Sequence, residues 1–334
     1  MPSPPDIARA RSFLEQRYGP AVGVVEWAGE GAWSRCFGFE HEGRELVVRF
    51  GRHRSDFEKD RRASGFRGPG LPVPELLELG RAFGAHFAVS TRGRGEPLET
   101  LSSEAWQAAL PSVLGTLDAT RDLDLSKTSG WGRWGADGQG EETSWREFLL
   151  AVEKDDPVSR IHGWRERLAE SPEGDAAFRS GHARLVEITA DLSVGRHLVH
   201  ADLINRNVLV AGDRVGAIFD WGSSLYGDFL YDLAWLEFWS PWHPGLAAVG
   251  IRAEARRHYE AIGLEVPDFE RRMLASAAHI GLGHLAYNAH TGNRAALTAV
   301  VERLAPMLDA PVQGTLTRSS PGERPGLSSW ACRG

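Results

Sequence analysis

Residues 200–207 read HADLINRN, a polar stretch set between two apolar runs. Residues 198–199 (LV) precede it and residues 208–210 (VLV) follow it, so we expect a loop that joins two short strands. A further carboxylate, Asp220, ends the next apolar run, residues 215–219. Such a loop holds its polar side chains at a fixed spacing, and its carboxylate and amide groups are candidates for chemistry.

The spacing H-x-D-x-x-x-x-N is the catalytic-loop pattern of phosphoryl-transfer kinases. Phosphoryl transfer spreads negative charge over the moving group, so the protein must position the attacking hydroxyl and neutralise that charge with Mg²⁺. We predict that Asp202 is the catalytic residue and accepts or orients the hydroxyl proton. We predict that Asn207 and Asp220 hold the metal, because Mg²⁺ prefers hard oxygen ligands. In the alternative interpretation, Asp202 and Asn207 are ordinary turn residues, and His200 is expected to be only a structural prop.

The rest of the chain divides into a β-rich part and a mostly helical part. Before residue 96 the apolar patterns predict strands at 22–27, 36–40, 45–50, 75–79 and 86–90, and helices at 6–18 and 55–65. After residue 96 they predict helices at 105–119, 145–152, 176–192, 229–238, 247–262, 268–290 and 293–308, and short strands at 197–200 and 207–219. The Gly-rich stretch 129–140 is expected to form an ordered loop.

This layout predicts an α+β fold with two lobes. Residues 1–95 form a small β-rich N-lobe that binds the nucleotide, with a hinge at 91–95. Residues 96–313 form a larger, mostly helical C-lobe that carries catalysis and substrate binding. Residues 314–334, rich in Ser, Pro, Gly and Arg, are expected to be a disordered tail. A ligand is expected in the cleft between the lobes.

Composition restricts the classes of function. The 334 residues carry a formal net charge of −7, which argues against a nucleic-acid partner and is compatible with a cationic small molecule. The two cysteines, Cys36 and Cys332, lack metal-type neighbours and are expected to be free thiols. We find no signal peptide and no apolar run long enough to span a membrane, so we expect a cytoplasmic monomer with no membrane partner.

Several stretches resemble the aminoglycoside phosphotransferase family, which has a protein-kinase-like two-lobed fold and uses ATP or GTP with Mg²⁺. They are residues 196–202 (RHLVHAD), 207–209 (NVL), 219–221 (FDW) and 227–234 (GDFLYDLA). Three more resemble the hygromycin B 4-O-phosphotransferase branch of that family: residues 125–135, 143–148 and 238–242. The similarity covers roughly residues 10–305, and it implies an antibiotic kinase acting on an aminoglycoside.

The resemblance places a phosphate-covering loop at residues 29–34 (GEGAWS), where backbone N–H groups of Gly29, Gly31 and Ser34 could approach the phosphates. A plain hairpin turn is the alternative for this stretch. The hinge residues Thr91 to Gly93 would offer backbone hydrogen bonds to the nucleotide base.

At the position where kinases carry a phosphate-binding Lys, this chain has Arg49. Arginine keeps the positive charge but differs from lysine in geometry, so this is a departure from the family pattern. Its acidic partner on the following helix is either Glu58 or Asp60. The alternative is a surface Arg on an edge strand.

For the substrate, the resemblance points to residues 238–242 (FWSPW). Trp239 and Trp242 could stack on the apolar faces of sugar rings, although core packing is the alternative for both. The nearby Glu237 is expected to meet substrate ammonium groups. Arg206 departs from the branch pattern, which has Asn at this place, and its positive charge beside a cationic substrate is unfavourable. We expect Asp232 to brace the catalytic loop and Asp228 to cap the helix that begins near Phe229.

Two other functions compete with the antibiotic kinase. The same fold serves kinases of metabolites such as choline, a sugar or an amino alcohol, and fold alone does not name a substrate. A degenerate kinase that only binds is the second alternative. The presence of Asp202, Asn207 and Asp220 argues against it, and Arg49 is the one feature in its favour.

Overall fold

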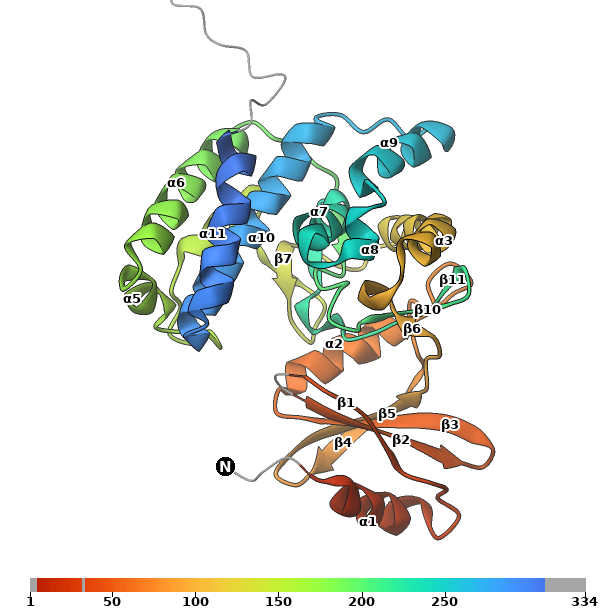
Figure 1. Cartoon of the computed structure of the whole chain (residues 1–334). Coiled ribbons are helices and arrows are strands. Elements are labelled where there is room, and N and C mark those ends of the chain that lie inside the picture. Colours follow the sequence, from red (N-terminus) through yellow and green to blue (C-terminus); the bar gives the residue numbers. More distant parts are fainter. Residues whose placement is uncertain (1–4, 32–33, 310–334) are drawn as a thin grey trace, which may run out of the picture.

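The computed structural model describes residues 5–31 and 34–309, and the predicted tail, Cys332 included, lies outside this range. The N-terminal part is a five-stranded antiparallel sheet with the order β1-β2-β3-β5-β4 (Figure 1). Its elements are α1 (Ile7–Tyr18), β1 (Glu26–Glu30), β2 (Ser34–His41), β3 (Arg44–Gly51), α2 (Arg54–Ser64), β4 (Leu76–Ala82) and β5 (Ala85–Thr91). The two-lobed α+β prediction is confirmed.

Helix α1 covers one face of this sheet, and it begins at Asp6, whose side chain accepts a hydrogen bond from the Arg9 N–H at 2.9 Å. Between α1 and the sheet lies a core of its own, with Leu14, Phe37 and Phe87 among its buried members. The predicted strands match the observed ones closely except the first. Residues 22–25 are not in the ladder, although Val22 and Val25 are buried, so apolar burial was wrongly interpreted as strand pairing.

The chain passes to the C-terminal part through a tightly packed connection. Strand β6 (Glu96–Pro97) already belongs to a second sheet, because it pairs with β10 (Val208–Ala211). A side chain at Gly93 would lie 2.5 Å from the Ala217 Cβ, so only glycine fits there. The predicted boundary at 91–95 remains a prediction, which the division of the core into two clusters supports.

The C-terminal part is mostly helical and holds the larger core, around Trp106, Leu236 and Leu285. After η1 (Leu98–Thr100) its helices are α3 (Ser103–Arg121), α4 (Trp145–Leu150), η2 (Ala151–Glu153), α5 (Trp164–Ala169), α6 (Pro172–Ile188), η3 (Trp221–Ser223), α7 (Leu230–Trp239), η4 (Ser240–Trp242), α8 (Pro244–Ala247), α9 (Ile251–Ala261), α10 (Phe269–Thr291) and α11 (Arg294–Asp309). Its remaining strands are β7 (Trp131–Trp134), β8 (Gly140–Glu142), β9 (His197–Val199), β11 (Arg214–Ile218) and β12 (Leu225–Gly227). Figure 1 shows α10 packed among α6, α7 and α11, which explains its burial on nearly every side.

Three predictions for this part were wrong in detail. Residues 129–140 are not a loop throughout, because β7 and the start of β8 fall within them. The helix predicted at 247–262 begins only at Ile251, as α9, because Gly250 adopts the left-handed conformation (φ 65°) between the end of α8 and the start of α9. Helix α5 was not predicted at all. A helix of only six residues is too short to show a periodic apolar pattern in the sequence.

Helix α2 joins the two parts through a buried lysine. The Lys59 ammonium donates to the backbone oxygens of Gly222 and Ser224, both at 3.1 Å, and lies 4.9 Å from the ring of Trp134. Burial lowers the pKa of Lys59 from its ordinary 10.5 to about 8. The small lobe is therefore attached to η3, directly beside the predicted metal ligand Asp220.

This buried lysine gives a pH-dependent prediction for Lys59→Met. Because the folded-state pKa lies below the unfolded one, the unfolded chain holds one more proton between about pH 8 and 10.5, so the contribution of Lys59 to the free energy of unfolding rises with pH across this window. The advantage of wild type over the variant should grow by about 2–3 kcal/mol across it. Urea unfolding on both sides of the window measures this difference, and a difference independent of pH would contradict the assignment.

Candidate active site

The catalytic loop is held from behind by a buried carboxylate. Asp232, in α7, accepts hydrogen bonds from the backbone N–H groups of His200 (2.8 Å) and Ala201 (2.7 Å). The His200 ring is fully buried, bonds to the Phe219 carbonyl at 3.0 Å, and packs against Trp221. Burial lowers the pKa of His200 to about 4, so the ring is neutral. The predictions that Asp232 braces the loop and that His200 is a structural prop are confirmed.

Inside the loop, amide side chains fix the predicted catalytic carboxylate. The Asn205 Nδ2 donates to Asp202 Oδ1 at 2.7 Å, and the Asn207 Nδ2 donates to the Asp202 backbone oxygen at 2.8 Å. Ala201, Asn205 and Arg206 all have positive φ, at 59°, 79° and 65°. Such conformations cost about 1–3 kcal/mol each, and they cluster where function requires a particular geometry.

The Asp202 carboxyl is half-buried, and burial raises its pKa from 3.8 to about 7. The hydrogen bond from Asn205 opposes this rise, and the nearby charge of Asp220 adds to it. A carboxyl that titrates near neutrality is a better proton acceptor than an ordinary aspartate. The environment of Asp202 therefore suits a group that takes a hydroxyl proton.

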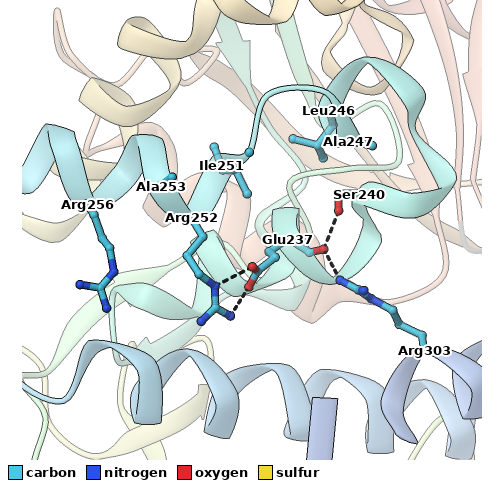
Figure 2. A pocket seen from close by; sticks show the side chains of 10 residues that line it. Glu237, Ser240, Leu246, Ala247, Ile251, Arg252, Ala253, Arg256 and Arg303 are labelled. Carbon is cyan, nitrogen blue, oxygen red and sulfur yellow. Dashed lines mark hydrogen bonds and ion pairs between the residues drawn. The ribbon is translucent and has the colours of Figure 1, made fainter. Parts of the chain in front are cut away.

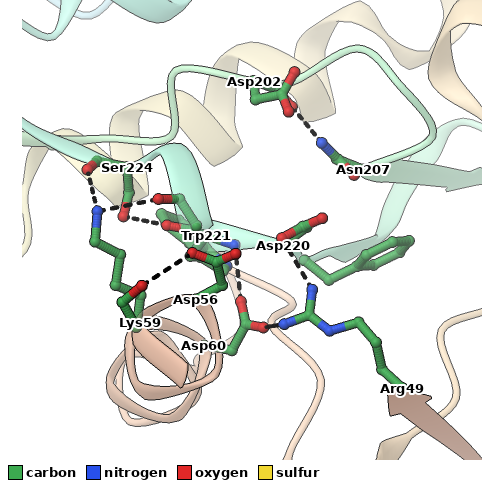
Figure 3. Close-up of polar contacts among 12 residues, drawn as sticks. Arg49, Asp56, Lys59, Asp60, Asp202, Asn207, Asp220, Trp221 and Ser224 are labelled. Atoms are coloured by element: carbon green, nitrogen blue, oxygen red, sulfur yellow. Dashed lines mark hydrogen bonds and ion pairs between the residues drawn. The ribbon is translucent and has the colours of Figure 1, made fainter. Parts of the chain in front are cut away.

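Arg49 lies between the two lobes and pairs with two carboxylates (Figure 3). Its Nη1 donates to Asp220 Oδ1 at 2.9 Å, and its Nη2 pairs with Asp60 Oδ2. Burial lowers the pKa of Arg49, but the charges of Asp60 and Asp220 outweigh burial and raise it. Asp60 also accepts the backbone N–H of Trp221 through its other oxygen at 2.8 Å. The alternative of a surface Arg is excluded, since Arg49 is 15% exposed.

The partner of Arg49 that the sequence left open is thus Asp60. Glu58 is also buried, but it bonds to Arg54 and Arg61 on its own helix. Asp60 is one helical turn from Asp56, which is held by Arg160 of the C-lobe at 2.6 Å. This face of α2 therefore points at η3, next to the predicted metal ligand Asp220.

The oxygen atoms of Asn207 and Asp220 fit a magnesium ion. The Asn207 Nδ2 is used within the loop, which leaves the amide Oδ1 for a cation, and the bond from Arg49 to Asp220 Oδ1 leaves Oδ2. In residues 5–31 and 34–309 no group of three or more His, Cys, Asp or Glu side chains is placed to hold a metal. Mg²⁺ in phosphoryl-transfer sites needs only one or two such ligands, because phosphates and water complete its shell. The donor set is consistent with this.

The structure locates part of the predicted nucleotide site. The Gly31 N–H donates to the Ser34 carbonyl at 2.9 Å, and Gly29 has a φ of 153°, so this turn needs glycine. Residues 32–33 lie outside the described residues. At the hinge, the Thr91 N–H is bonded to the Glu75 carbonyl and is not available to a nucleotide base. The Arg92 N–H is likewise bonded to the Glu45 carbonyl, and the prediction that residues Thr91 to Gly93 offer backbone hydrogen bonds to the base stays a prediction.

The predicted substrate residues lie at the end of α7. Trp242 is 41% exposed and contacts Trp239, with 5.2 Å between ring centroids, whereas Trp239 packs against the core. The Glu237 carboxylate lines a cavity of about 370 Å³ and is bound there by Arg252 through both oxygens, at 2.6 and 2.5 Å (Figure 2). Because Arg252 already neutralises Glu237, its predicted contact with substrate ammonium groups gains no support.

Asp228 was predicted to cap α7, but the N-cap residue is Phe229, and Asp228 lies one residue before it. The Asp228 Oδ1 accepts the Leu230 N–H at 3.0 Å, and both carboxylate oxygens also bind Arg272, at 2.6 and 2.8 Å. This buried pair ties the start of α7 to α10. The sequence analysis did not predict two hydrogen bonds near the catalytic loop. The Asn205 side chain donates to Asp202, and the Glu99 side chain accepts the Arg206 N–H at 2.6 Å. Asn205 lies within the catalytic motif itself, whereas no local pattern marks Glu99.

A two-lobed fold with an Asp–Asn–Asp site at the lobe junction defines a kinase-like phosphotransferase. The profile of the phosphotransferase enzyme family matches residues 28–264. The chain belongs to this family. It is 34% identical over 285 residues to hygromycin-B 4-O-kinase of Escherichia coli, covering 84% of this chain and 79% of that protein.

Solved structures agree with this assignment. The crystal structure of aminoglycoside phosphotransferase APH(4)-Ia superposes with a TM-score of 0.79 at 30% identity, covering 91% of this chain and 98% of that one. A thermostable mutant of the same enzyme, in a ternary complex with AMP-PNP and hygromycin B, superposes with a TM-score of 0.77 at 31% identity, covering 89% and 97%. Spectinomycin phosphotransferase APH(9)-Ia, at 12% identity and a TM-score of 0.59, shares the fold.

Removing the partner of Arg49 tests the lobe junction. In Asp60→Ala, Arg49 keeps only Asp220 and the Trp221 N–H loses its acceptor, so we expect the KM for the nucleotide to rise about tenfold or more. Glu58→Gln, on the same helix, is the matched control and should change the nucleotide KM less than about twofold. Steady-state kinetics with varied nucleotide measures both, and equal effects of the two variants would show that Asp60 has no special role.

Proposed function

We propose that this protein is an antibiotic kinase that transfers the γ-phosphoryl group of ATP or GTP to a hydroxyl of an aminoglycoside, hygromycin B or a close relative of it, and thereby confers resistance. The observation that carries the proposal is that Asp202 and Asn207 are bonded to each other within one loop, to which the segment that ends in Asp220 is also bonded. The Phe219 N–H donates to the Asn207 carbonyl at 3.0 Å, which joins the segment of Asp220 to the catalytic loop. The similarity to a hygromycin-B 4-O-kinase supports the substrate class.

The roles of the residues follow from their surroundings. Asp202, with its pKa raised to about 7 by burial, would take or orient the proton of the attacking hydroxyl. Asn207 and Asp220 would hold Mg²⁺, which when bound neutralises charge on the phosphates. Arg49 would contact the phosphates as a fixed positive charge while Asp60 holds it in place. The glycines at 29 and 31 would let the backbone approach the phosphates closely.

Substrate recognition is proposed for the end of α7. The exposed face of Trp242 could stack against a sugar ring, and Trp239 would support it from below. The position of Arg206 is compatible with a cationic substrate only if its guanidinium points into solvent, and Arg206 is exposed. Glu237 is not included, because Arg252 occupies it.

A metabolite kinase of the same fold is the second candidate, and the choice between the two depends on the acceptor. In the described part of the chain no helix is both long enough and apolar enough to cross a membrane. The cytoplasmic location, the monomeric state and the preference for ATP or GTP stay predictions.

Direct phosphorylation tests the proposal. With Mg²⁺ and ATP or GTP, the protein should add one phosphoryl group to hygromycin B, which mass spectrometry of the product detects. Asp202→Asn should lower kcat by about a hundredfold or more and still bind the nucleotide. Transfer to choline or simple sugars with none to a panel of aminoglycosides would favour the metabolite kinase, and full activity in the Asp202→Asn variant would show that the catalytic role is misassigned.

The aromatic platform gives a second test. Trp242→Ala removes an exposed indole, so the KM for hygromycin B should rise about tenfold while the KM for the nucleotide stays the same. Trp242→Phe should recover most of the loss, because a ring remains. An unchanged KM for the antibiotic in Trp242→Ala would place the substrate elsewhere.

A further inference from the structure

Glu99 is an acidic side chain aimed at the catalytic loop from outside it. It lies in η1, directly after the hinge, and its Oε1 accepts the backbone N–H of Arg206 at 2.6 Å. Its Oε2 is buried and bonds to no group in the part of the chain that the structure describes. Buried polar atoms are normally hydrogen-bonded, so this unpartnered oxygen draws attention to what the other oxygen of Glu99 does.

The residues that Glu99 holds are the strained ones. Arg206 and its neighbour Asn205 are two successive non-glycine residues with positive φ, a conformation that persists only where surrounding contacts impose it. The Asn205 side chain in turn donates to Asp202 Oδ1 at 2.7 Å. A continuous chain of contacts therefore runs from Glu99, through the Arg206 backbone and Asn205, to the predicted catalytic carboxylate.

The support for Glu99 is itself rigid. The preceding residue, Leu98, is 1% exposed and belongs to the large core. Strand β6, just before it, pairs with β10, the strand that leaves the catalytic loop, through Pro97 and Leu209. The same short segment thus fixes the loop at two points, by strand pairing after the loop and by the Glu99 side chain within it.

We propose that Glu99 is a positioning residue for phosphoryl transfer, which fixes the left-handed Asn205–Arg206 pair so that the Asn205 amide orients the Asp202 carboxylate. This inference rests on the proposed function, because it assigns Asp202 the role of hydroxyl acceptor. Glu99 acts through geometry: what it supplies is an acceptor oxygen at a fixed place. The side-chain amide of glutamine would supply the same oxygen without the charge.

Four variants test this chain of contacts. Glu99→Ala should lower kcat about tenfold to a hundredfold with the KM for nucleotide and antibiotic within about twofold, because misplacing a catalytic group slows the chemical step. Glu99→Gln should recover most of that loss. Asn205→Gly keeps the left-handed backbone, removes the amide and should lower kcat to a similar extent. The double variant Glu99→Ala/Asn205→Gly should lose little more than either single one, because both act on one contact.

The control is Glu104→Gln. Glu104 is an exposed residue in the first turn of α3 whose carboxylate accepts a hydrogen bond from Ser102, and its replacement should leave kcat unchanged. Thermal unfolding and nucleotide binding show whether each variant is folded. If Glu99→Ala does not fold, the kcat values of Glu99→Gln and Asn205→Gly still test whether Glu99 positions Asp202 through Asn205. A Glu99→Gln variant that loses as much as tenfold, a rise in antibiotic KM without loss of kcat, or additive effects in the double variant would each overturn the inference.

The slow transfer of phosphate from nucleotide to water, measured without antibiotic, separates this inference from the proposed function. If the wild type phosphorylates no aminoglycoside, the proposed function fails. The positioning role is then judged by whether Glu99→Ala and Asn205→Gly slow nucleotide hydrolysis equally and non-additively while Glu99→Gln does not. Equal hydrolysis in all four variants and in the wild type would contradict it.

Discussion

The ion network of Arg49 with Asp60 and Asp220 is the contact on which the rest of the site depends. It joins the third strand of the small lobe, helix α2 and the segment of the large lobe that carries Asp220 in one place. A guanidinium cannot lose its charge, so two carboxylates are needed to stabilise it where water is scarce. Breaking such a pair leaves an uncompensated buried charge, at a cost of about 3–5 kcal/mol. The pair of contacts thereby fixes the position of Arg49, the proposed phosphate contact, relative to Asp220, the proposed metal ligand.

The catalytic loop is also stabilised by carboxylates from other segments, which hold its strained backbone in place. Asp232 holds the start of the loop through two backbone N–H groups, and Glu99 holds its far side through a third. Both carboxylates come from segments distant in sequence. The loop can therefore keep three residues, Ala201, Asn205 and Arg206, in the left-handed region.

The sequence predicts the lobes, most helices and the triad of Asp202, Asn207 and Asp220, because these depend on local spacing and apolar periodicity. It could not choose between Glu58 and Asp60, since the two residues lie about half a turn apart on α2 and only tertiary packing decides which faces Arg49. The role of Glu99 could not be predicted from the sequence either, because only tertiary packing brings it to Arg206, which is 107 residues away in the chain. The β7–β8 hairpin was hidden by glycines that suggested a loop.

The central claim is that two oxygen atoms, Asn207 Oδ1 and Asp220 Oδ2, bind one Mg²⁺ beside a nucleotide while Arg49 stays on Asp60. A crystal structure of the protein with AMP-PNP, Mg²⁺ and hygromycin B measures this directly. We expect both oxygens at about 2.1 Å from the ion and a substrate hydroxyl within hydrogen-bond reach of Asp202. A metal held by other side chains, or a hydroxyl remote from Asp202, would contradict it.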